Sequence, residues 1–162
     1  MIQVGMLIAT LLLLLAAADD FSRRIVPNWL SVALAADGIV LRTLDRNLLL
    51  GVAAAFIVFV LAALCWRRGL MGGGDVKLLA AASLLFSPSL VPRFVLLVAL
   101  AGGVLGLAYC AMRLVLRTPS PIRPRALIAR ILRIERHRIS RGFSLPYASA
   151  IAAGGVYSLL KG

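Results

Sequence analysis

Asp20 and Asp75 stand where the sequence changes between apolar and polar character. Asp20 follows an uncharged apolar run over residues 2–18, and Asp75 follows three successive glycines at the start of another run. Two carboxyl groups held close together in a poorly solvated place share a proton, because both cannot ionise cheaply. One then acts as general base on a water molecule, while its protonated partner hydrogen-bonds a peptide carbonyl and assists the departing amine. Such a pair cuts amides without a metal ion.

Each aspartate also has a purely structural interpretation, in which it caps a helix or pairs with a cation. The nearby cations are Arg23, Arg24 and Lys77. The glycines favour the catalytic interpretation, because glycine accepts backbone angles closed to other residues and lets a second backbone approach closely. We therefore expect Gly72 and Gly74 to shape a turn in which a peptide can lie beside Asp75.

The elements that must position these residues are those of a membrane protein. Apolar residues make up 62% of the 162 residues, against ~45–50% in soluble domains, and the mean hydropathy is +0.99. The net charge is +12, but the basic residues lie between apolar runs and few aromatic residues accompany them, which argues against a nucleic-acid-binding surface. The composition excludes an ordinary soluble globule.

Six apolar runs are candidates for spanning helices, which need about 20 apolar residues each. They cover residues 2–18, 29–41, 48–66, 76–90, 94–112 and 143–160. The fourth run is short and contains Pro88. A secretory signal requires Lys or Arg before its apolar segment, and none precedes the first run. We therefore expect this run to be retained. The sequence predicts an all-α polytopic membrane protein, one domain over residues 1–162, with about six transmembrane helices.

The distribution of Lys and Arg predicts the orientation of these helices, because connections rich in them stay cytoplasmic. Odd-numbered connections carry Arg23, Arg24, Arg67, Arg68 and the arginines of residues 113–141, and the others carry only Arg42, Arg46, Arg93 and Lys161. This bias places Asp20 and Asp75 together at the cytoplasmic face. Over residues 126–134, apolar and Arg residues recur at helical spacing. We expect an amphipathic helix on anionic lipid there, with a solvated cationic loop as the alternative.

The chain offers no usual zinc site. It has one histidine, His137, and its two cysteines, Cys65 and Cys110, lie inside apolar runs without a C-x-x-C pair. We expect no metal, no cofactor and no disulfide, with both cysteines as small buried hydrophobic residues.

Three motifs resemble those of one family. Residues 72–79, GGGDVKLL, resemble the GxGD motif of intramembrane aspartyl proteases, in the form seen in bacterial prepilin peptidases. Asp20, followed eight positions later by Asn28, resembles that family's first-aspartate motif, and residues 145–155 resemble its last helix, with Ala148 in place of the usual Gly. The spacing to Asn28 in this motif selects Asp20 over Asp19. Neighbours on a helix point about 100° apart, so we expect only one of the two to face Asp75.

The resemblance implies an aspartic endopeptidase, with Asp20 and Asp75 as its catalytic residues. It implies removal of leader peptides from prepilin and pseudopilin precursors, at the cytoplasmic face of the bacterial inner membrane. Larger members carry a zinc-binding insertion and methylate the new N-terminus. This chain lacks a match to that insertion and is similar to the short peptidases of Flp-type (tight adherence) pilus systems, so we expect no methyltransferase activity.

Two neighbours have open roles. Asn28 is expected either to orient the substrate or to cap the second helix. Lys77 is expected either to lower the pKa of Asp75 or to contact a lipid phosphate. The expected partners are the precursors and membrane lipids, not nucleic acid, and the oligomeric state is not predicted.

Two alternatives to a pilin-processing protease stay open. In a non-enzymatic subunit or small transporter of a pilus or secretion system, the carboxylates would pair with Arg or relay protons, and Asp37 is the candidate acid near the bilayer midplane. A peptidase for archaeal flagellins or sugar-binding precursors would share the aspartate pair and differ only in its substrate.

Overall fold

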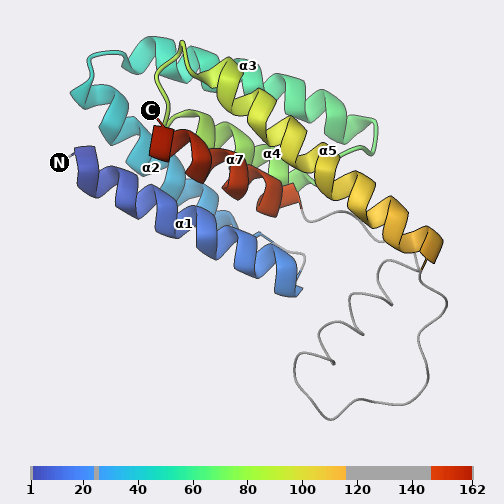
Figure 1. The fold of residues 1–162 in the computed structure, drawn as a ribbon. Coiled ribbons are helices and arrows are strands. Elements are labelled where there is room, and N and C mark those ends of the chain that lie inside the picture. The colour runs from blue at the N-terminus through green and yellow to red at the C-terminus, as the bar shows by residue number, and fades with distance from the viewer. Residues whose placement is uncertain (1, 24–25, 116–146, 162) are drawn as a thin grey trace. The chain divides into compact units, whose positions relative to one another are not determined.

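The computed structural model describes residues 2–23, 26–115 and 147–161. In these residues every regular element is a helix, as the sequence predicts (Figure 1). The helices are α1 (Ile2–Arg23), α2 (Asn28–Leu44), α3 (Leu48–Arg67), α4 (Gly73–Ser83), α5 (Val91–Val115) and α7 (Tyr147–Lys161). The predicted amphipathic helix over 126–134 and His137 lie outside the described residues.

The chain divides into two compact units. The first unit comprises Met1–Gly102 and Pro146–Gly162, and the second comprises Gly103–Leu145. The described part of the second unit is the later portion of α5. All candidate site residues lie in the first unit, and the description of helix packing and of the site is confined to it.

Three of the described helices, α1, α3 and α5, are long and apolar enough to cross a membrane. The stretches that qualify are Ile2–Ser22, Leu48–Arg67 and Val91–Ala111. This supports a membrane protein with several spans, while six spans stay a prediction. The helix predicted from the run 76–90 is much shorter than that run. α4 has 11 residues, about 16 Å of helix, against a hydrocarbon core of ~30 Å.

The early end of α4 has a local cause. After Ser83 the chain turns through successive i to i+3 hydrogen bonds, in which the N–H groups of Leu84, Leu85 and Phe86 donate to carbonyls three residues back. Pro88 follows and cannot continue a helix at this point. A run of apolar residues shows how many such residues follow one another, but it does not show where a helix within the run ends.

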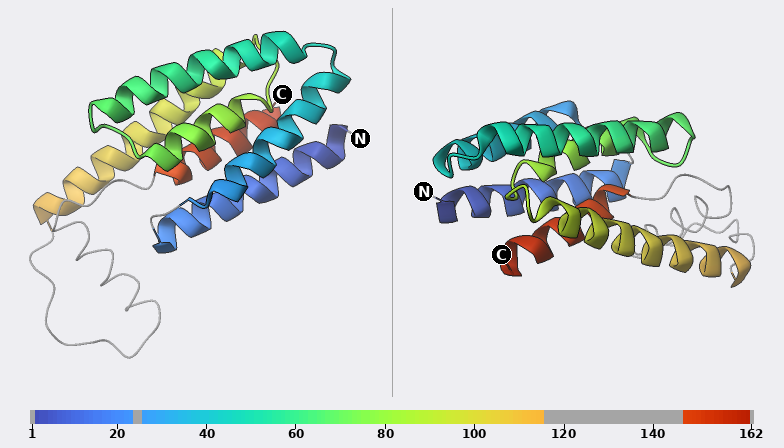
Figure 2. Two further views of the ribbon diagram at one scale, coloured as in Figure 1. Left: turned by 180° about the vertical axis from the view of Figure 1, so that it is seen from behind. Right: turned by 90° about the horizontal axis from the view of Figure 1, so that it is seen from above.

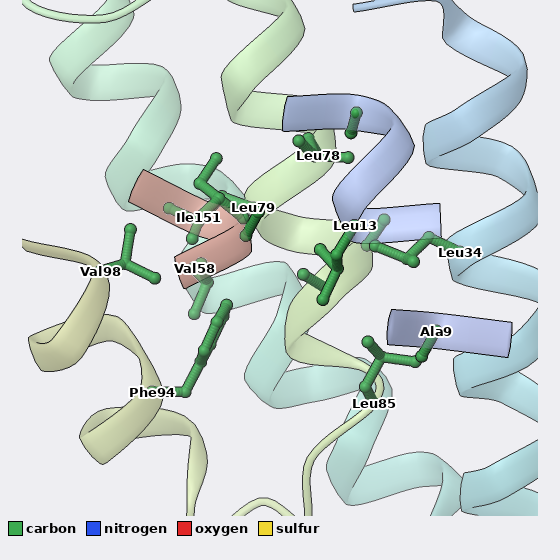
Figure 3. Packing of buried hydrophobic residues seen from close by; sticks show 14 of the residues in the cluster. Ala9, Leu13, Leu34, Val58, Leu78, Leu79, Leu85, Phe94, Val98 and Ile151 are labelled. Atoms are coloured by element: carbon green, nitrogen blue, oxygen red, sulfur yellow. The ribbon is translucent and has the colours of Figure 1, made fainter. Parts of the chain in front are cut away.

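Short α4 is the centre of the first unit. It packs against α2, α3 and α7, and α1 packs against α2 and α7; Figure 2 shows α4 among these helices. Its Leu78 and Leu79 are buried with Leu13 of α1, Leu34 of α2 and Ile151 of α7 (Figure 3). Burial of these side chains fixes the rotation of α4 about its axis, and therefore the direction in which its first turn presents Asp75.

Glycines allow two close helix contacts in this core. A Cβ on Gly38 of α2 would lie 2.5 Å from Leu84 Cβ, and one on Gly154 of α7 would lie 2.8 Å from Val98 Cγ2 of α5. Small residues at such crossings are how helices approach closely in a membrane.

The ends of several helices lie together at one end of the first unit. α1 and α3 finish there, and α2, α4 and α7 begin there (Figure 1). We call this the site end. α1 and α7 run antiparallel, since Asp20 lies beside Ala148 while Leu13 lies beside Gly155.

The prediction that both cysteines are buried is wrong. Cys65 of α3 and Cys110 of α5 are free and exposed. Neither side chain belongs to the cluster of buried hydrophobic residues that forms the core.

Candidate active site

Asp20 occupies the last turns of α1 and points into the protein. Its side chain is only 5% exposed, whereas Asp19 is half-buried. The backbone N–H of Ala148, in the first turn of α7, donates a hydrogen bond of 3.0 Å to Asp20 Oδ2. The first N–H groups of a helix have no partner inside it and carry the positive end of its dipole, so they stabilise an ionised carboxylate.

Asp75 occupies the third position of α4, whose N-cap is Gly72. The backbone N–H of Gly72 donates to the Asp75 carboxylate, which is one half of a capping box. A Cβ on Gly72 would lie 2.8 Å from Asp75 Oδ2. Glycine at 72 therefore makes room for the carboxylate that folds back over it.

The expected reason for the glycines needs correction. Gly72 has φ −74° and ψ 146°, which other residues adopt freely. In the described residues the glycine with positive φ is Gly69, at 72°. A Cβ on Gly74 would meet Val26 at an ordinary 3.6 Å. What distinguishes Gly72 is the lack of room for a Cβ beside the Asp75 carboxylate, and not an unusual backbone angle.

The two carboxyl groups are electrostatic neighbours. Asp75 lies outside the three helices long enough to span a membrane, and its pKa is raised to about 7. Burial is the main cause, the negative charge of Asp20 adds to it, and the hydrogen bond from Gly72 opposes both. The structure thus brings Asp20 and Asp75 together at the site end, with a proton retained on Asp75 up to near neutral pH.

Asn28 and Lys77 pair with each other on another side of α4. Lys77 Nζ donates to Asn28 Oδ1 over 3.2 Å. Two helix positions separate Lys77 from Asp75, which is about 200° of rotation, so Lys77 points away from the carboxylates. The expectation that Lys77 lowers the pKa of Asp75 is wrong, as is the expectation that Asn28 caps α2. The N-cap of α2 is Pro27, with no side-chain hydrogen bond.

Asp37 and Asp45 do not join the pair. Asp37 lies midway along α2 and faces α1 at Gly5, where a glycine Cβ would lie 3.3 Å from Asp37 Oδ1. Gly5 is 15 residues from Asp20 along α1, about 22 Å. Asp45 pairs with Arg42 at 3.0 Å.

Across residues 2–23, 26–115 and 147–161, no group of three or more His, Cys, Asp or Glu side chains could hold a metal ion.

The contribution of residue 148 was missed by sequence reasoning, which considered only the exchange of Gly for Ala there. The contact is made by the backbone. A signal for it exists in the sequence, because Pro146 followed by an apolar run marks a helix start with free N–H groups. Nothing local to residues 146–150 indicates which side chain they meet.

One comparison with known proteins bears on this geometry. A family model described as the type IV leader peptidase family matches residues 7–107. The chain belongs to the type IV leader peptidase family. The match includes both Asp20 and Asp75, and it ends before α7, so the leader-peptidase match does not extend to the Ala148 contact. Neither a curated protein nor a solved structure matches the chain significantly. Membership makes this chain a leader-peptidase-type protease, and it confirms the family resemblance.

Proposed function

We propose that this leader peptidase is an aspartic endopeptidase that uses Asp20 and Asp75 to remove leader peptides from prepilin and pseudopilin precursors. One observation carries the proposal. Two buried carboxyl groups, from helices more than fifty residues apart in the chain, interact at one end of the bundle, and one of them keeps its proton to about pH 7. Nearby carboxyls with unequal proton affinity are suited to acid–base hydrolysis.

The surroundings suggest a division of roles. Asp20 receives a backbone N–H bond from the start of α7, which favours its ionised form, so it acts as the general base. It takes a proton from a water molecule as the water oxygen bonds to the peptide carbonyl carbon. Asp75 carries the other proton, donates a hydrogen bond to the carbonyl oxygen, and passes that proton to the amine nitrogen as the C–N bond breaks.

The location of the site supports a cytoplasmic cut. Arg67 and Arg68 are exposed at the site end, and exposed arginine at a helix end favours the cytoplasmic side. We place the protein in the bacterial inner membrane with this end facing the cytoplasm. A precursor would keep its apolar helix in the bilayer and present its leader at the rim. The chain acts without methylating the product, as a short peptidase of the Flp type.

The test is co-expression with a candidate prepilin, followed by leader removal on a gel. Asp20→Asn and Asp75→Asn should each abolish cleavage. Asp19→Asn is the matched control, since it changes a neighbouring carboxyl that is half-buried and adjacent in sequence. Membrane levels of each variant are measured alongside. Normal processing by either the Asp20 or the Asp75 variant contradicts the proposal.

A further inference from the structure

A groove runs along α2, α3 and α4, on the side of α4 that carries Lys77. It has a volume of about 590 Å³. Ala80 and Ala81 of α4 belong to its lining, and their small side chains leave room between α2 and α3. Val32 of α2 and Phe56 of α3 line it and stay 67% and 64% exposed. The groove is therefore open to the surroundings of the bundle, which for these apolar side chains is the bilayer.

The polar groups of the groove gather toward one end. Its polar lining residues are Asn28, Ser31 and Lys77, all near the site-end starts of α2 and α4. Lys77 has three N–H donors and gives one to Asn28 Oδ1. The remaining ammonium donors and the Asn28 amide N–H groups suit a phosphate oxygen. No acidic side chain belongs to the lining, all of which falls in the described part of the chain.

The length of the groove fits one leaflet. Its α2 wall extends from Asn28 to Ile39, eleven steps of helix or about 16 Å. The hydrocarbon core is about 30 Å thick, so the groove reaches from the rim to the middle of the membrane. A fatty acyl chain has this reach. The membrane-spanning helix of a precursor needs about 20 residues to cross this core, so it is about twice as long as the groove.

We propose that this groove is a binding site for an anionic phospholipid of the leaflet at the site end. One acyl chain lies against Ala80, Ala81 and the apolar walls, and the headgroup phosphate contacts Lys77 and Asn28. This site is separate from the carboxyl pair and does not depend on the proteolytic proposal. A lipid held there packs against α4, the helix that bears Asp75.

The test measures lipid binding to the detergent-purified full chain by native mass spectrometry. Phosphatidylglycerol is titrated against the wild type, Lys77→Gln and the matched control Lys161→Gln, which changes an exposed lysine on α7. We expect one phosphatidylglycerol to be retained by the wild type and the control, with about fivefold weaker binding to Lys77→Gln. Equal binding to Lys77→Gln and the wild type overturns the proposal.

Further measurements distinguish a bound phospholipid from other possible occupants of the groove. Ala80→Leu fills the groove and should also weaken binding, with circular dichroism melting to verify folding; if that variant is unfolded, Lys77→Gln still decides. Inorganic phosphate alone should not protect the wild type from thermal unfolding, and protection equal to that from phosphatidylglycerol would show a free-anion site instead. Displacement of the bound lipid by a precursor helix peptide would assign the groove to the substrate and also overturn the proposal.

Discussion

Ala148 and Asp20 are joined by a 3.0 Å hydrogen bond although 128 positions separate them in the sequence. The bond brings the first turn of α7 onto a carboxyl group at the end of α1. The family match ends at residue 107, so α7 adds a contact to the site from beyond the matched region. A version of this chain without α7 would leave Asp20 without that backbone donor.

Replacing Ala148 with Pro should slow cleavage, because Pro has no N–H to donate to Asp20. A hydrogen bond to a charged group contributes ~1.5–3 kcal/mol, so we expect at least a tenfold loss of rate. Ser149→Pro is the control, as it removes the next N–H in the same first turn, where the N–H groups have no partner inside the helix. Rates are measured on a prepilin at equal membrane levels. Equal losses in the two variants would point to damage to α7 and not to the lost donor.

The cleavage rate should fall as the pH rises through about 7. Burial and the charge of Asp20 raise the pKa of Asp75 to about 7, and our mechanism needs Asp75 protonated. Above that pH the acid form is lost, and the rate should drop about tenfold per pH unit. Initial rates in detergent or liposomes between pH 5.5 and 9 provide the measurement. A rate that stays constant to pH 9 would contradict the role of Asp75 as acid.

Asp75→Asn should abolish cleavage and yet stabilise the fold at higher pH. In the folded protein the pKa of Asp75 is raised from 3.8 to about 7, so between these values the folded state holds a proton that the unfolded state has released. Wild-type stability then falls as the pH rises from about 4 to about 7 and levels off above it. The amide side chain of the Asp75→Asn variant does not ionise, so the variant does not lose stability in this way as the pH rises. The difference in melting temperature between variant and wild type should grow over this window, and a constant difference would contradict it.

Gly72→Ala should impair cleavage more than folding. The added Cβ would lie 2.8 Å from Asp75 Oδ2, so the carboxylate must leave its place over Gly72. Gly73→Ala is the matched control, because its Cβ would meet Trp66 Nε1 at an ordinary 3.5 Å. We expect at least a tenfold loss of cleavage for the first variant and little change for the second. Similar activity in both would show that the carboxylate adjusts without cost.

The sequence predicted the helices from its apolar runs, and it predicted that Asp20 and Asp75 lie at the same end of the helices from the distribution of Lys and Arg among the connections. Apolar runs indicate helices, and the eight-residue spacing to Asn28 distinguishes Asp20 from Asp19. The contacts between distant segments were not predictable in this way. The approach of Ala148 to Asp20 and the pairing of Lys77 with Asn28 depend on how α4 rotates among its neighbours, which tertiary packing decides. The short length of α4 was missed for a similar reason, since the residues after Ser83 are as apolar as those before it.

A contact at the far end of α4 restrains the end of this helix that carries Asp75. Arg42 of α2 is 6% exposed, and its Nη2 donates to the carbonyl of Leu85, just past the end of α4, over 3.3 Å. The same guanidinium holds Asp45 at 3.0 Å. Any sliding of α4 that altered the approach of Asp75 to Asp20 must break this tether or drag α2 along with it. The contacts of Arg42 therefore help to set the distance between the carboxyl groups of Asp20 and Asp75, although they lie at the other end of α4.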